Sequence, residues 1–176
     1  MKKFNLILST VALVSFGTLQ ASAHITLEQQ EAAVASGYKA VFRVGHGCEG
    51  KPTNTVRVQI PEGVISVKPQ PKAGWTVEKQ RGEYERAYDY YGTPMTEGVK
   101  EVIWGGGSLA DDEYDEFVLR AYLTDSLEPG TTLYFKVVQE CPDGAAERWI
   151  ELPADGQDPH ELESPAPGVM LLPAKS

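Results

Sequence analysis

The residues with the most distinctive chemistry lie at positions 21–24, which read Ala-Ser-Ala-His. The basic start at 1–3, the mostly apolar run Phe4–Phe16 and the Ala-x-Ala motif form the three-part pattern of a cleaved secretory signal. The apolar run is shorter than the roughly 20 residues of a membrane-spanning helix, which makes an uncleaved anchor the weaker alternative. Cleavage after Ala23 would make His24 the first residue of the mature chain.

A histidine at the start of a chain carries an α-amine and an imidazole on one residue. The amine has a pKa of about 7.7 to 8, so it is partly deprotonated at neutral pH, and a metal ion displaces the remaining proton. Copper(II) prefers nitrogen and oxygen donors in a tetragonal plane. His24 would therefore chelate Cu(II), but it needs further donors. The alternative is a mature N-terminal histidine that is simply exposed.

The segment 45–52 offers such donors. It contains three glycines and a proline, which indicate a loop after the alternating strand 38–44. His46 and Glu49 would approach the N-terminus if the first strand pairs beside the strand that leads into this loop. A carboxylate from Glu49 would neutralise part of the copper charge, whereas His46 is equally well explained as a structural histidine.

Cys48 and Cys141 are far apart in the sequence and do not form a Cys-x-x-Cys pair. In an oxidising compartment we expect them to form one long-range disulfide, which in the chain-entropy model stabilises a fold by about 4 to 5 kcal/mol. A thiolate metal site at Cys48, beside His46 and Glu49, is the competing interpretation. The disulfide would bring the turn at 141–144 next to the loop 45–52.

Trp149 follows that turn and would then pass close to the same loop. The face of an indole can cover a cationic site and shield it from water, although a tryptophan in a sandwich core is more common. We expect Trp75 and Trp104 to be core residues and His160 to be exposed.

The composition and the missing motifs exclude several classes of function. A formal net charge of −9 disfavours binding to nucleic acid or anionic lipid, and it favours cations or simply solubility. The sequence has no Gly-x-Ser-x-Gly, phosphate loop or His-Glu-x-x-His motif, so hydrolase and nucleotide-binding functions lack a starting point. The acidic segment 111–116 lacks the spacing of a calcium loop and fits a solvated turn better. No second hydrophobic span follows the signal.

The fold class follows from strands and turns. Eight or nine short strands separated by Gly and Pro predict an all-β, antiparallel sandwich of immunoglobulin-like type, with a closed barrel as the alternative. Segment 81–91 could be a strand pair or a loop. We expect a signal peptide at 1–23, one domain at 24–153 and a Pro-rich arm at 154–176 whose apolar end, Val169–Leu172, packs on that domain.

Several motifs together resemble the YcnI-like (DUF1775) family of exported copper-binding proteins. The motifs are His-Ile-Thr-Leu-Glu at 24–28, the loop 45–53, Ile-Pro-Glu-Gly-Val at 60–64, Gly-Trp at 74–75, Trp-Gly-Gly at 104–106, and Arg-Trp at 148–149 with a Pro-Ala-Pro tail. The likeness covers nearly the whole mature chain. It implies a cupredoxin-like sandwich that binds Cu(II) through a single-histidine brace.

The resemblance also implies roles for individual residues. His24 would supply the amine and imidazole, Glu49 the carboxylate, and Trp149 an indole against the metal. Relatives with the brace have a Pro-x-Glu type segment where this chain has His-Gly-Cys-Glu at 46–49, so the position of the carboxylate tolerates a shift of a residue or so. That departure leaves open whether His46 joins the site.

The leading hypothesis is an exported, periplasmic or secreted protein, not an enzyme, that holds Cu(II) for trafficking or homeostasis. Its expected partners are the copper ion and another exported copper chaperone or copper-enzyme assembly factor. A copper-dependent oxidoreductase is the first alternative, and it would require His46 as a second histidine ligand. A metal-free module for envelope interactions is the second.

Overall fold

Residues 24–175, which the computed structural model describes, form β-strands joined by turns and two short 3₁₀ segments; the expected signal peptide, 1–23, lies outside the described residues. No helix within 24–175 is long and apolar enough to cross a membrane. The strands are β1 (Thr26–Leu27), β2 (Glu31–Ala33), β3 (Ser36–Val44), β4 (Thr53–Gln59), β5 (Val64–Pro69), β6 (Thr76–Tyr90), β7 (Thr93–Leu109), β8 (Asp115–Leu123), β9 (Thr132–Tyr134), β10 (Val137–Glu140), β11 (Ala146–Trp149) and β12 (Gly168–Leu172), and the 3₁₀ segments are η1 (Pro142–Gly144) and η2 (Pro159–Glu161).

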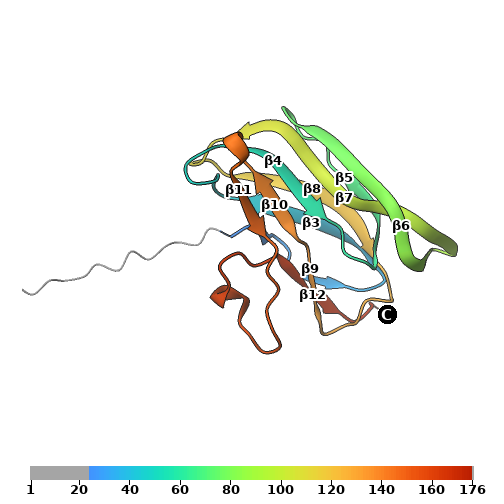
Figure 1. The fold of residues 1–176 in the computed structure, drawn as a ribbon. Coiled ribbons are helices and arrows are strands. Elements are labelled where there is room, and N and C mark those ends of the chain that lie inside the picture. The colour runs from blue at the N-terminus through green and yellow to red at the C-terminus, as the bar shows by residue number, and fades with distance from the viewer. Residues whose placement is uncertain (1–23, 176) are drawn as a thin grey trace, which may run out of the picture.

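Two sheets pack face to face, with strand orders β1-β3-β8-β5 and β11-β10-β4-β7-β6 (Figure 1). Alternate side chains of β3, β8, β4 and β7 point inward, as expected for strands with one buried face. They form one core that includes the fully buried Phe42, Phe117 and Trp104. The predicted antiparallel sandwich is confirmed. Trp104 is a core residue as expected, whereas Trp75 is half-buried at the rim, edge-on to Phe117.

A third, small sheet ties the C-terminal arm to the body. Its order is β2-β12-β9, in which β12 pairs parallel with β2 and antiparallel with β9. The inward side chains Val169 and Leu171 are 0% and 2% exposed. The apolar end of the arm is thus a strand within the fold. Figure 1 shows the arm, in red, looping close to the point where the described chain begins.

The β6–β7 hairpin departs from the expectation of uniformly short strands, because its strands have 15 and 17 residues. Its distal half extends past the ends of the other strands (Figure 1). There Tyr84 and Tyr88 pack on Ile65 of β5 in a second, separate hydrophobic cluster. Segment 81–91, for which a strand pair and a loop were both open, forms most of β6.

Glu62 anchors this hairpin, and we predict that its charge stabilises the fold. Its carboxylate accepts hydrogen bonds from Lys100 Nζ and, at 2.9 Å, from the Tyr88 hydroxyl. Burial alone would raise the pKa of Glu62, but these bonds and the Lys100 charge together lower it. The carboxylate therefore stabilises the fold above the unfolded-state pKa of about 4.3, and this contribution is lost as the pH falls through the lower folded-state pKa.

The check is denaturant unfolding of Glu62→Gln beside the parent protein at several pH values. We expect a loss of about 1 kcal/mol at pH 7 that shrinks toward zero near pH 3. Glu83→Gln, at an exposed position of β6, is the matched control and should change little. A pH-independent difference between Glu62→Gln and the parent would contradict the prediction.

Candidate metal centre

Strand β1 places His24 beside the loop 45–52. It pairs antiparallel with β3, with Thr26 opposite Arg43 and Leu27 opposite Phe42. Continuing this register brings His24 level with Gly45, next to His46 in sequence. The pairing on which the approach of His46 to the N-terminus depended is therefore confirmed.

A disulfide brings the second half of the chain to the same place. Cys48 and Cys141 are bonded, as predicted, and the described residues contain no free cysteine. After the turn at η1, β11 returns along β10 with Trp149 opposite Val137. Trp149 thus lies near the loop 45–52, as its spacing from Cys141 suggested, and it is only 5% exposed.

The two histidines meet at the indole of Trp149. The ring centroids of His24 and Trp149 are 5.6 Å apart, and those of His46 and Trp149 are 5.9 Å apart. Both imidazoles stand edge-to-face to the indole, at interplanar angles of 60° and 77°. Residues from the start of the chain, from the β3–β4 loop and from β11 therefore share one contact.

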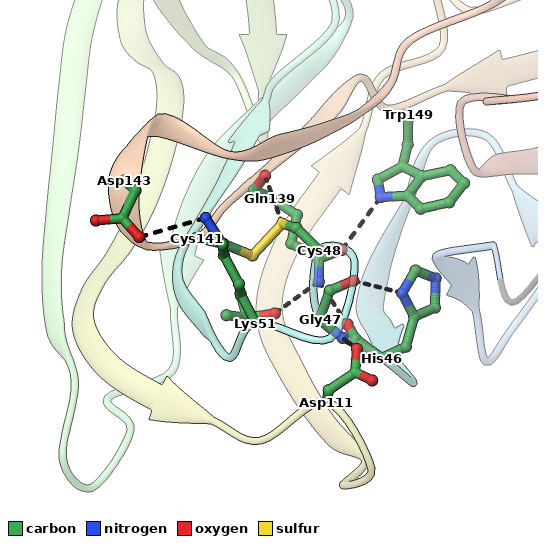
Figure 2. The surroundings of a disulfide bond; sticks show 10 residues. His46, Gly47, Cys48, Lys51, Asp111, Gln139, Cys141, Asp143 and Trp149 are labelled. Carbon is green, nitrogen blue, oxygen red and sulfur yellow. Dashed lines mark hydrogen bonds and ion pairs between the residues drawn. A yellow bond between two sulfur atoms is a disulfide. The ribbon is translucent and has the colours of Figure 1, made fainter.

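Gln139 fixes the positions of this group from within the core. Its side-chain oxygen accepts a 3.3 Å hydrogen bond from Trp149 Nε1 (Figure 2). Its side-chain nitrogen donates to the His46 carbonyl and to Thr53 Oγ1. Gln139 is 0% exposed, so these bonds compensate for burying its amide. The indole and the backbone of His46 are thereby held against the same side chain.

The ring of His46 presents a defined nitrogen to its surroundings. Its Nδ1 lies 2.5 Å from the carbonyl oxygen of Gly47, and a carbonyl can only accept a hydrogen bond. Nδ1 therefore carries the proton, and in the neutral ring Nε2 keeps its lone pair. A backbone bond of this kind at one ring nitrogen is how proteins orient the other nitrogen toward a metal.

Gly47 is required by the close approach of two backbones. A Cβ at this position would lie 1.8 Å from the carbonyl oxygen of Lys51. The Gly47 N–H donates a 2.9 Å hydrogen bond to Asp111 Oδ1, from the turn between β7 and β8 (Figure 2). These contacts fix the backbone on which His46 sits.

The remaining histidine, His160, belongs to the same region. Partial burial lowers the pKa of His24, and the charges of His160 and His46 lower it further, against the effect of a hydrogen bond with the Glu163 backbone. His24 is thus favoured in its neutral form, which is the form that binds metal. His160 is exposed, as expected, but it lies on η2 of the arm, within electrostatic range of His24.

A surface hollow opens beside His24. It lies between β1 and the arm, and its wall includes His24, His160, Tyr134 and the segment 165–168. The arm is held there by backbone hydrogen bonds, among them Ala166 N–H to the Glu151 carbonyl and Phe135 N–H to the Pro167 carbonyl. All three histidines of the chain therefore lie at one end of the sandwich.

Comparison with known proteins assigns a family. Residues 24–171 match the family described as "Domain of unknown function (DUF1775)". The chain belongs to the DUF1775 family. No curated protein matches it.

Solved structures bear on the fold of this DUF1775 chain. A crystal structure of an uncharacterized protein from Nocardia farcinica, with an immunoglobulin-like fold, is similar with a TM-score of 0.64 and 24% identity, over 85% of this chain and 99% of that one. A DUF4466 family protein from Parabacteroides merdae reaches a TM-score of 0.31 at 12% identity, over 67% of this chain and 37% of that one. The first supports an immunoglobulin-like fold.

Glu49, the expected source of a carboxylate, lies at an exposed turn of the loop 45–52. Glu49 and Gly50 form the tip of a two-residue turn between Cys48 and Lys51, with φ of 51° and 82°, and Glu49 is exposed. It is not among the charges that shift the pKa of His24. Within residues 24–175, no three or more His, Cys, Asp or Glu side chains are arranged to hold a metal ion.

The donors that are present fit copper(II) on one condition. Two imidazoles, His24 and His46, stand at one indole, and nitrogen donors of this kind suit Cu(II). Side chains alone leave the ligand set short, and the α-amine of His24 would complete a chelate once the chain begins at that residue. The fit to this DUF1775 protein therefore depends on processing before His24.

Two residues of this site were missed from the sequence. Gln139 follows Val137 and Val138 in a strand, and a polar residue at an inward position of such a strand is the only signal that could have indicated it. His160 has no such signal, because its place depends on how the arm returns over β1.

Proposed function

We propose that this DUF1775 protein is exported, is processed before His24, and holds one Cu(II) ion for copper trafficking or homeostasis. The observation that carries the proposal is the shared contact of His24 and His46 with the Trp149 indole. The lowered pKa of His24 supports it, because a neutral imidazole needs no proton removed before it binds metal. The disulfide is compatible with an oxidising, exported compartment.

Each residue has a role in this proposal. His24 supplies amine and imidazole, and His46 offers Nε2 because Nδ1 is engaged by the Gly47 carbonyl. Trp149 covers one side of the ion and excludes water. His160, on the arm, is the remaining nearby imidazole. The bound copper ion would be an exchangeable cargo. Another exported copper chaperone, or an assembly factor for a copper enzyme, would receive it.

A titration with Cu(II) tests the proposal. The chain is expressed with its signal, its start at His24 is verified by mass spectrometry, and it is compared with a version carrying one extra N-terminal glycine. We expect one tight equivalent in the His24-start protein and roughly hundredfold weaker binding in the extended one, because the extension removes the chelating amine. Equal affinity in both versions, or no stoichiometric binding, would overturn the proposal.

The position of His46 also favours a second candidate, a copper-dependent oxidoreductase, because oxidative copper enzymes with an N-terminal histidine chelate use a second histidine. The discriminating measurement is copper-dependent peroxide formation in the presence of a reductant. Peroxide formation that is lost in His46→Ala would support catalysis, and its absence from the copper-loaded protein would favour the trafficking role.

A further inference from the structure

Three cations stand in a row across the outer face of the first sheet. Arg120 of β8 is paired with Lys39 of β3 on one side and with Lys68 of β5 on the other, and all three are exposed. Adjacent strands lie about 4.8 Å apart, so these side chains are direct neighbours. Like charges directly opposite one another destabilise a sheet. The row therefore works against the stability of the strands that carry it.

The described residues provide no ion pair for Lys39, Arg120 or Lys68. This is unexpected in a chain with 25 acidic and 16 basic residues. Further along the same two strands, Arg43 and Glu116 face each other and do form an ion pair, at 3.8 Å. The sheet thus neutralises one outward cation and leaves the three cations of the row outside any ion pair of the described residues, although Asp89 and Asp125 act electrostatically on the nearby Tyr122.

Three tyrosines, Tyr90, Tyr91 and Tyr122, lie next to this row of cations. Tyr122, two residues after Arg120 on the same face of β8, packs against Tyr90 and Tyr91 at the tip of the β6–β7 hairpin, with ring centroids 5.3 and 5.4 Å away. Tyr91 is 77% exposed. The hairpin that extends past the other strands in Figure 1 therefore ends at a cluster of tyrosines next to the cations. We call this cluster, Tyr90, Tyr91 and Tyr122, the aromatic wall.

Two backbone features hold this arrangement. Tyr91 has φ of 52° and Gly92 has φ of 83°, a left-handed pair typical of a two-residue hairpin turn, in which asparagine, aspartate or glycine is the usual first residue. A tyrosine in this conformation is strained, and its side chain is largely exposed. Ser66, with φ of 54°, lies in a bulge between Ile65 and Lys68, and such bulges re-aim the side chains that follow.

A hollow lies between the row and the wall. Its lining includes Lys68, Arg120, Tyr90, Tyr91 and Tyr122, together with Gly37. A Cβ at Gly37 would lie 3.6 Å from Arg120 Nη2, so the guanidinium extends over a residue without a side chain. The hollow combines tyrosine rings with cations that form no ion pair within residues 24–175, and it is lined by residues other than those of the metal centre.

We propose that this hollow binds an acidic sugar unit of a polysaccharide, with its carboxylate on Arg120 and Lys68 and its ring against Tyr91 and Tyr122. A guanidinium matches a carboxylate with two parallel hydrogen bonds. Exposed aromatic rings offer a rigid apolar surface on which a sugar ring packs. A long nucleic acid would be repelled by the net charge of −9. An acidic peptide would also place a carboxylate on the Arg120 guanidinium, but it brings no sugar ring to pack against Tyr91 and Tyr122, so it serves as a competing probe in the test.

Calorimetric titration of the full chain tests this inference with three probes of similar length: oligogalacturonate, an uncharged galacto-oligosaccharide and oligoglutamate. We expect binding of oligogalacturonate alone. Arg120→Gln and Tyr91→Ala should each weaken it roughly tenfold, by removing a charge-assisted contact and a stacking contact respectively. Lys136→Gln, an equal charge change at an exposed residue between β9 and β10, is the control and should leave affinity unchanged.

Thermal unfolding of the same variants separates binding from folding. Arg120→Gln should keep or raise the midpoint, because it relieves repulsion within the row. Loss of oligogalacturonate binding with an undiminished midpoint would support the site. Equal binding of oligoglutamate would overturn the sugar assignment, and no binding of oligogalacturonate, or binding untouched by both variants, would overturn the site itself.

Discussion

Replacing Cys48 and Cys141 together with serine is expected to lower the free energy of unfolding by about 4 kcal/mol, since the bond closes a loop with a sequence separation of 93. Both cysteines are buried. The disulfide is the covalent tie between the β3–β4 loop and the end of β10, and the unfolded chain gains most from its loss when the loop is long.

The measurement is guanidinium unfolding of the double variant beside the oxidised parent. Lys51→Gln is the matched control, because Lys51 and Asp143 form a 3.3 Å exposed ion pair between the same two turns. An exposed pair of this kind contributes at most about 1 kcal/mol, so the control should remain close to the parent. If the double variant unfolded at the same denaturant concentration as the control, the disulfide would have no such role.

The same double substitution should also weaken copper binding. His46 is two residues from Cys48, and Trp149 follows Cys141 on the strand that returns along β10. Without the bond, the Gln139 hydrogen bonds remain as a tie between the histidine loop and the indole. We expect the affinity for Cu(II) to fall while the stoichiometry stays at one.

The sequence predicted those features of the fold and of the site that follow from local rules of strand pairing and disulfide bonding. Alternation and turn residues were enough for the sandwich, and the placement of His24 beside the loop followed from pairing its strand with the strand that leads into that loop. The disulfide and the approach of Trp149 needed only the oxidation of two cysteines and a short return strand. Each of these steps joins neighbours in sequence or residues that share a covalent bond.

The parts that were missed depend on long-range packing. Most of β6 is exposed, and in its distal half Arg86 stands between the buried Tyr84 and Tyr88 on the same face, so the alternation that marks a strand is interrupted. His160 reaches the site because β12 is drawn between β2 and β9 and the preceding arm must cross over β1. Glu49 was proposed from the composition of the loop and from the family resemblance, and neither indicated the two-residue turn that places it at an exposed tip.

Replacing His46 with alanine should weaken Cu(II) binding by roughly a hundredfold in the His24-start protein, because it removes an imidazole and not merely a neighbour of the site. The engagement of His46 Nδ1 by the Gly47 carbonyl, which leaves Nε2 as the donor nitrogen, and the proximity of both rings to Trp149 are the reasons for this expectation. His160→Ala is the matched control: His160 is exposed on the arm, and its loss should change affinity far less.

Spectroscopy of the copper-loaded variants gives a second readout that instability cannot imitate. In the parent, electron paramagnetic resonance should show two imidazole nitrogens coupled to Cu(II), and in His46→Ala only one. The Gln139 bonds to Thr53 and Trp149 do not involve the His46 ring, so the variant should remain folded. An unchanged spectrum and affinity in His46→Ala, together with losses in His160→Ala, would transfer the second imidazole to the arm and make His46 a structural residue of the loop.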